Sequence, residues 1–167
     1  MSLAGLAIAE AVPADVEAIM ACERQPGYED TVGRWSREEH LAGMADATHR
    51  YFIRRDAQGN VGRFVMLQKI DVPAESVLIR RIATIKQGLG HGTALLAHAL
   101  DFIFGKLRAN KAYLYVWPHN ARGIALYSKL GMRDDGVSND ERDGVRMTIM
   151  AITAETYHAW KPRSACP

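Results

Sequence analysis

The sequence predicts an α/β (α+β) fold, a mixed sheet with helices on both faces, in one domain spanning residues 1–167. The length of 167 residues fits a single hydrophobic core. Hydrophobic residues make up 48% of the chain and charged residues 24%, which is typical of a folded globular protein. Segments with hydrophobic periods of two and of about 3.6 residues alternate along the chain, with no linker or internal repeat between them.

The N-terminal third predicts one strand and two helices. The strand is expected at about Leu6 to Glu10, where the first apolar run lies. Pro13 opens a first helix, because apolar residues recur after it at helical spacing. Ser36 and Glu39 have the spacing of a capping box, so a second helix is expected to start there and run through Met44.

From His49 the hydrophobic period changes to two, which indicates strands. The stretch HRYFIRRDAQGNVGRFVMLQKID predicts a hairpin whose turn lies at residues 58–60. After Pro73, the run ESVLIRRIATI is rich in branched residues and predicts a third strand of this group. That strand leads directly into the segment QGLGHG, Gln87–Gly92.

A strand-helix-strand unit follows the glycine segment. Apolar residues after Gly92 recur on one helical face, and KAYLYVW predicts a strand at Lys111 to Trp117. Asn120 is expected to cap a last helix, which Gly131 ends in the usual C′ position. VRMTIMAI predicts the strand that closes the sheet, paired with residues 132–137.

Composition narrows the classes of function. With 21 basic and 19 acidic residues, the net charge of +2 is too small for a nucleic-acid-binding stripe. Cys22 and Cys166 have neither a CxxC spacing nor a neighbouring His pair, so no metal site is predicted. The apolar opening lacks a basic region and soon meets Glu10, and no run is long enough to span a membrane. We therefore expect a cytoplasmic protein without nucleic-acid or membrane partners.

The glycine segment is the strongest candidate for a binding site. Glycines 88, 90 and 92 immediately precede a helix, whose unpaired N–H groups and dipole favour a bound phosphate. Alternatively, the glycines relieve crowding of the helix against the sheet. A Rossmann site is disfavoured, because the spacing is GxGxG and the next strand, KAYLYVW, holds no carboxylate. A P-loop is disfavoured because no Gly-Lys-Ser/Thr follows.

Two motifs at the expected separation resemble the acyl-CoA-binding core of the GNAT superfamily of N-acyltransferases. They are IATIKQGLGHG and NARGIALYSKLGM. The family signature of Gln or Arg, two residues, Gly, one residue, and Gly or Ala is matched by Gln87, Gly90 and Gly92. Asn120 and Tyr127, seven residues apart and followed by Leu-Gly-Met, match the second motif. The resemblance covers residues 77 to about 137.

The resemblance implies a fold and a cofactor. The fold is a mixed, mostly antiparallel sheet of six to seven strands, splayed at the cofactor site and flanked by about four helices. A bulge near Arg81 or Ile82 would splay the strand from its neighbour and open a slot. The cofactor is acetyl-CoA, held by pantetheine contacts to the strand end and by pyrophosphate contacts to the glycine turn. The cofactor-binding residues implied are Ile82, Ala83, Thr84, Gln87, Gly88, Leu89, Gly90, His91, Gly92, Thr93, Asn120 and Tyr127.

Two catalytic residues are predicted. Tyr127 is the general acid that protonates the departing thiolate, unless it is simply a core aromatic. Glu75 is the candidate general base, with Glu29, His40 and His119 behind it; each could instead be a surface residue, and water could take the proton. By resemblance, a main-chain N–H near Ile82 stabilises the oxyanion.

The expected function is an acetyl-CoA-dependent N-acetyltransferase, so the domain 1–167 is expected to be an N-acetyltransferase domain. An acetyl group would pass from CoA to a primary amine by direct attack in a ternary complex. The acceptor would be a small-molecule or peptide amine. The acidic turn SNDERDG could attract a cationic amine, or it could simply be solvated. The alternative is a non-catalytic CoA-binding regulatory module. A homodimer is a reasonable expectation for a small enzyme.

Overall fold

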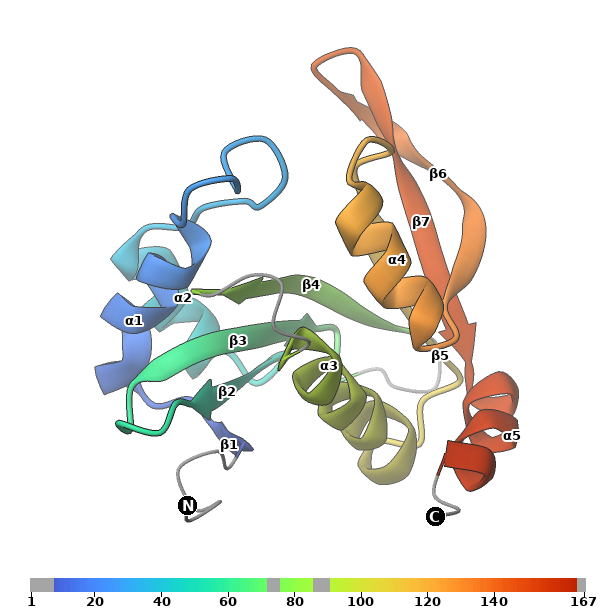
Figure 1. Cartoon of the computed structure of the whole chain (residues 1–167), viewed down its shortest axis with the longest axis horizontal. Helices are drawn as coiled ribbons and strands as arrows, with labels where there is room; N and C mark the ends of the chain where they lie inside the picture. The colour runs from blue at the N-terminus through green and yellow to red at the C-terminus, as the bar shows by residue number, and fades with distance from the viewer. Residues whose placement is uncertain (1–7, 72–75, 86–90, 165–167) are drawn as a thin grey trace.

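The computed structural model describes residues 8–71, 76–85 and 91–164 and contains one seven-stranded sheet (Figure 1). The strand order is β1-β2-β3-β4-β5-β7-β6. All neighbouring strands are antiparallel except β4 and β5, which are parallel. This confirms the predicted mixed, mostly antiparallel sheet. The strands are β1 (Ile8–Glu10), β2 (His49–Arg55), β3 (Val61–Gln68), β4 (Val77–Thr84), β5 (Lys111–Val116), β6 (Arg133–Arg142) and β7 (Val145–Thr153).

The helices largely follow the predicted ones. They are the 3-10 turn η2 (Pro13–Asp15), α1 (Val16–Glu23), α2 (Arg37–Ala45), α3 (His91–Asp101) with its π-helical continuation η3 (Phe102–Lys106), α4 (Ala121–Lys129) and α5 (Ala154–Ser164). The predicted capping box of α2 is present, since Ser36 Oγ accepts from the Glu39 amide and Glu39 Oε2 from the Ser36 amide. Helix α5 was not predicted from the sequence. Thr153 caps its first turn, since Thr153 Oγ1 accepts a hydrogen bond from the Thr156 amide at 3.2 Å.

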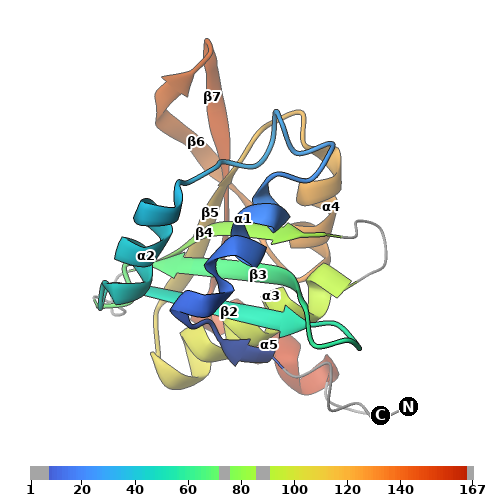
Figure 2. The same ribbon diagram turned by 90° about the vertical axis from the view of Figure 1, so that its left-hand side faces the viewer.

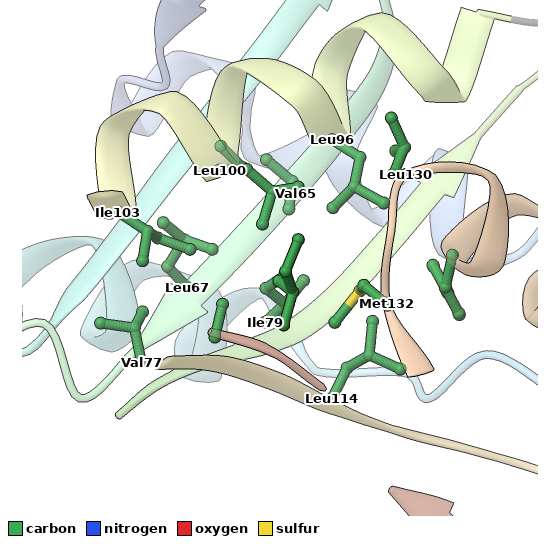
Figure 3. Close-up of a cluster of buried hydrophobic side chains, with 14 of the residues drawn as sticks. Val65, Leu67, Val77, Ile79, Leu96, Leu100, Ile103, Leu114, Leu130 and Met132 are labelled. Carbon is green, nitrogen blue, oxygen red and sulfur yellow. The ribbon is translucent and has the colours of Figure 1, made fainter. Parts of the chain in front are cut away.

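Helices cover both faces of the sheet. Figure 2 shows α1 in front of β2, β3 and β4, with α3 behind them. Alternate residues of β3 point to opposite faces of the sheet. Phe64 and Met66 pack in the hydrophobic cluster that contains residues of α1, and Val65 and Leu67 pack in the cluster that contains residues of α3. Figure 3 shows the second cluster, in which side chains of α3 lie over the sheet. Because successive side chains of a strand point to opposite faces, β3 contributes to the hydrophobic core on each side of the sheet.

The last hairpin extends farther than expected. β6 runs to Arg142, whereas a strand over residues 132–137 and an acidic turn at SNDERDG were expected. The actual turn lies at Asp143 and Gly144, whose φ values are 51° and 75°. Positive φ at both central residues is what a tight two-residue hairpin requires, and Asp-Gly is a favoured pair there. The full length of β6 was not predicted, because its residues are mostly polar and exposed and show no alternation of apolar and polar side chains.

The sheet is splayed between β4 and β5. Residues of these strands pair only at Val77 with Ala112 and at Leu78 with Tyr113, near the start of each strand. On the other side of β4, the register with β3 jumps from Ile79 to Arg81, so Arg80 is an extra, bulged residue. The bulge lies next to the position predicted for it. A bulge bends its strand, so β4 diverges from β5 and leaves main-chain groups exposed between them.

Candidate active site

A cleft of about 600 Å³ lies where β4 and β5 diverge. Its walls include the separated parts of these two strands, the start of α3, one side of α4, and residues 27, 28 and 31–33 of the loop after α1. The volume is that of a typical small-molecule site. The described residues of the motifs meet here, which makes the cleft the candidate active site.

The structure brings together the predicted cofactor residues that it describes with their side chains. These are Ile82, Ala83, Thr84, Thr93, Asn120 and Tyr127, and all six line the cleft. His91 and Gly92 are the first two residues of α3, so the glycine segment does lead into a helix N-terminus. Gln87, Gly88, Leu89 and Gly90 lie outside the described residues, as does the candidate base Glu75.

Tyr127 projects from α4 and contributes to both the core and the cleft. Its side chain is 9% exposed and packs in the cluster of α3, yet it also lines the cleft. Burial, with a smaller contribution from Tyr28, raises the pKa of Tyr127 to about 12. The phenol is therefore protonated at neutral pH and able to donate a proton.

Asn120 caps α4, as its position before the helix predicted. Its Oδ1 accepts from the Gly123 amide at 3.0 Å. A Cβ at position 123 would lie 2.7 Å from Asn120 Nδ2, so glycine leaves room for the cap. Asn120 and Gly123 both line the cleft, and the capping role is compatible with contact to a ligand.

The loop after α1 is fastened to the strand end by Tyr28. The hydroxyl of Tyr28 accepts from the Thr84 amide at 3.3 Å. Burial raises the pKa of Tyr28, so this hydroxyl is neutral at ordinary pH. Tyr28, Val32 and Gly33 of this loop line the cleft. The contact with Thr84 was not expected, because only the tertiary structure joins these segments.

None of the described base candidates lines the cleft. Glu29 is exposed and accepts from the Gly27 amide at 2.8 Å. His40 is buried, and its Nδ1 lies 3.0 Å from the Tyr51 hydroxyl. His119 is exposed beside Trp117. Among the described lining residues there is no Asp, Glu or His, and the charged ones are all arginines.

A buried ion pair supports the wall of the cleft that carries the bulge. Arg81 Nη1 donates to Glu23 Oε1 at 2.6 Å, and the Trp35 amide donates to Glu23 Oε2 at 3.1 Å. Glu23 is fully buried, and Arg81 lines the cleft. Neither residue was predicted to have this role. Their separation of 58 positions leaves no local signal by which to pair them.

The family of the chain follows from the part that contains this cleft. A model described as the acetyltransferase (GNAT) family matches residues 13–132. The chain belongs to this family. The match extends from before α1 to the end of the second motif, which confirms the resemblance inferred from the two motifs. The family is described as one of acetyltransferases, which are enzymes of the N-acyltransferase class.

Similar proteins agree with this assignment. The spermidine N(1)-acetyltransferase of Vibrio cholerae serotype O1 is 35% identical over 94 residues, which cover 54% of this chain and 53% of that protein. The chain thus matches about half the length of this curated relative. Mutant forms of the Vibrio cholerae spermidine/spermine N-acetyltransferase superpose with a TM-score of 0.77 at 23% identity, over 95% of this chain and 99% of theirs.

A dodecameric spermidine N-acetyltransferase from Vibrio cholerae gives a TM-score of 0.74 at 24% identity, over 92% of this chain and 96% of the other. At this level of identity the structural matches establish the GNAT fold alone. Within the described residues, no helix is long and apolar enough to cross a membrane. That part of the chain also holds no group of three or more His, Cys, Asp or Glu side chains placed to bind a metal ion.

Proposed function

We propose that this GNAT protein is an acetyl-CoA-dependent N-acetyltransferase. It moves an acetyl group from CoA to a primary amine by direct attack in a ternary complex. The observation that carries the proposal is the splay of β4 from β5, which opens a cleft lined by the main chain of residues 82–84 and by Tyr127. The Vibrio cholerae relative is named for the acetylation of spermidine, which supports an amine as the acceptor.

The residues of the cleft fit acetyl-CoA. Main-chain groups of β4 beyond the bulge have no partner in β5 and can bond the pantetheine arm. The start of α3 offers helix N-terminal amides to the pyrophosphate. Arg63, the cross-strand neighbour of Thr84, lies at the same end of the cleft. Its Nε and Nη1 atoms are buried without a hydrogen-bond partner among the described residues, as expected of a group that binds an anion.

Tyr127 supplies the acid. Acetyl-CoA contributes the acetyl group as a thioester, and the leaving sulfur needs a proton when the amine displaces it. A neutral phenol in a low-dielectric cleft can donate that proton. A main-chain N–H near Ile82 can stabilise the negative charge that develops on the carbonyl oxygen.

Direct attack is preferred to an acyl-enzyme because no cysteine or serine lines the cleft among the described residues. Cys22 is fully buried outside the cleft, and burial, followed by the charge of Glu23, raises the pKa of its thiol to about 12. A thiol in that state is inert. The attacking amine loses its proton to water or to Glu75, which stays the candidate base.

The second candidate is a CoA-binding regulatory module without catalysis. It takes its support from the cleft walls, which carry no carboxylate or histidine among the described residues. Tyr127 favours the enzyme, since a pure binder has no need of a proton donor among the residues that line the cleft.

Calorimetry and a thiol assay separate these proposals. We expect acetyl-CoA to bind with a dissociation constant in the micromolar range. We also expect at least one primary amine from a broad panel to release free thiol in its presence. Binding without thiol release from any amine would favour the regulatory module. Absence of binding at millimolar acetyl-CoA would rule out both.

We also propose that the enzyme acts in the cytoplasm and assembles into a homo-oligomer, with a homodimer as the simplest form. A similar solved structure is dodecameric, so larger assemblies are an alternative. Light scattering of the purified protein distinguishes monomer, dimer and dodecamer.

A further inference from the structure

The charges that line the cleft have one sign. The lining residues with charged side chains, within the described part of the chain, are Arg63, Arg80, Arg81, Arg122 and Arg142. Two of the five have roles already described. Arg81 is neutralised by the buried carboxylate of Glu23, and Arg63 lies beside Thr84 at the end of the cleft that leads to the glycine segment.

The bulge directs Arg80 to the face of the sheet opposite α3. Ile79 packs in the cluster of α3, whereas Arg81 reaches α1 on the other face. On β5, Leu114 and Val116 pack in the cluster of α3, so the intervening Tyr115 faces the same side as Arg81. Arg80 and Tyr115 both line the cleft.

Arg142 joins Arg80 from the end of β6. The two guanidinium groups interact electrostatically, and both side chains line the cleft. Figures 1 and 2 show that the β6–β7 hairpin and the loop after α1 extend at the same end of the molecule. Arg142 therefore reaches the cleft from a hairpin that lies at the same end of the molecule as the loop after α1.

Two cations that line one cleft, Arg80 half-buried and Arg142 exposed, favour an anion between them. Arg80 is half-buried; burial, then the charges of Arg81 and Arg142, lower its pKa. The acidic residues of the same hairpin do not line the cleft: Glu141 pairs with Arg146 at 3.6 Å, and Asp135 pairs with Lys111. A polyamine would meet repulsion here, because its distal ammonium groups carry the same sign as Arg80 and Arg142.

We infer that the acceptor carries, besides its primary amine, an anionic group, a carboxylate or a phosphate, which Arg80 and Arg142 bind. This inference rests on the proposed acetyl transfer and specifies its substrate class. Planar guanidinium groups bind both kinds of anion in bidentate geometry. The acceptor class then differs from the polyamine named for the Vibrio cholerae relative.

Matched amines test the inference through thiol release at saturating acetyl-CoA. One set is γ-aminobutyrate, n-butylamine and putrescine, which share a four-carbon chain and differ at the end away from one amine. A second set compares phosphoethanolamine with ethanolamine, so that the two sets distinguish a carboxylate from a phosphate. Spermidine is the polyamine reference. We expect the anionic member of at least one set to exceed its partners in kcat/KM by about tenfold or more.

Two variants test whether Arg80 and Arg142 cause the preference for an anionic amine. Arg80→Gln and Arg142→Gln should each raise the KM of the preferred anionic amine by about tenfold and change the KM of its neutral partner little. Arg146→Gln is the matched control, since Arg146 lies on the same hairpin but outside the cleft. It should leave both values unchanged.

The outcomes are distinct. Thiol release that is faster with putrescine, spermidine or the neutral amines overturns the inference and leaves the proposed acetyl transfer standing. An anion preference that survives both arginine variants also overturns it. Thiol release from no amine overturns the proposed transfer and this inference together.

Discussion

Arg81 donates a 2.6 Å hydrogen bond to Glu23 and so joins the bulged strand of the cleft to α1. The same carboxylate accepts from the Trp35 amide at 3.1 Å, and His40 Nε2 lies 2.9 Å from Oε1, an ion-pair distance without hydrogen-bond alignment. Glu23 and His40 are fully buried. This cluster holds helix, loop and strand in one arrangement, and the position of the cleft wall depends on it.

Glu23→Gln tests how much this cluster stabilises the fold. The change keeps the shape of the side chain but leaves the Arg81 charge buried without a counterion, which costs about 3–5 kcal/mol. We expect a loss of that size in the free energy of unfolding in urea at neutral pH. Glu17→Gln is the control, because Glu17 lies on the same helix in an exposed pair with Arg37. It should cost less than about 1 kcal/mol; equal losses would contradict the prediction.

The same carboxylate should make the fold sensitive to acid. Burial alone raises the pKa of Glu23, but the contact with His40, the charge of Arg81 and the Trp35 amide outweigh it, and the pKa lies below its ordinary 4.5. A carboxyl group whose pKa is lowered in the folded state stabilises that state at every pH above its ordinary pKa. The stabilisation is lost as the pH falls through the lowered pKa.

We therefore expect the stability difference between wild type and Glu23→Gln to be constant from neutral pH down to about pH 5 and to shrink below it. Urea titrations across this range measure it. A difference that grows toward acid would show that the pKa of Glu23 is raised.

Gly33 leaves room for the Arg81 guanidinium. A Cβ at this position would lie 2.5 Å from Arg81 Nη2, and Glu23 prevents the guanidinium from moving aside freely. We expect Gly33→Ala to cost about 1–3 kcal/mol in thermal unfolding. Gly105→Ala is the control, because nothing lies within 4 Å of a Cβ there. In a helical segment it should be neutral or slightly stabilising.

Local signals account for the features that the sequence predicted. The strand that ends in the glycine segment, the cap at Asn120 and the stop at Gly131 each depend on a few neighbouring residues, and the structure confirms the elements they define. The splay was predictable for a different reason. It follows from the family resemblance, and the bulge at Arg80 is its physical cause.

Features that depend on distant residues were not predictable. The segment SNDERDG, expected as an acidic turn, had suggested a site for a cationic amine, yet most of it lies in β6 and its residue that lines the cleft is Arg142. Arg142 comes near Arg80 because of the twist of the sheet and the length of β6. The hydrophobic periodicity of the sequence predicts neither of these two features. The pairing of Glu23 with Arg81 and that of Tyr28 with Thr84 likewise depend on packing across elements.

Asn120 combines a cap with a position in the cleft, and two substitutions separate these roles. Asn120→Ala removes the cap and should cost about 1 kcal/mol of stability, whereas Asn120→Ser keeps a capping oxygen and should cost little. If the amide group also contacts CoA, both variants will weaken CoA binding in calorimetry. If CoA binding is weakened only in Asn120→Ala, the variant that loses stability, Asn120 has a purely structural role.

Tyr127→Phe tests the general acid. Removing the hydroxyl should lower kcat by about a hundredfold or more, which is the usual effect of losing a general acid, and should change the dissociation constant of CoA by less than about twofold. Tyr113→Phe is the matched control, since the Tyr113 hydroxyl accepts from Lys69 outside the cleft. Its kcat should equal that of wild type. Unchanged turnover in Tyr127→Phe would remove the phenol from the mechanism.

The pH dependence of turnover provides an independent check on Tyr127. Burial raises its pKa to about 12, so the proton needed by the leaving group stays on the phenol through the alkaline range. The acceptor amine, in contrast, becomes a better nucleophile as it loses its own proton. We expect kcat to rise from neutral pH and then to stay level to about pH 10. Stopped assays, with circular dichroism to verify folding, measure the profile. A descending limb centred near pH 9 in wild type and absent from Tyr127→Phe would show that the phenol ionises too early to be the acid.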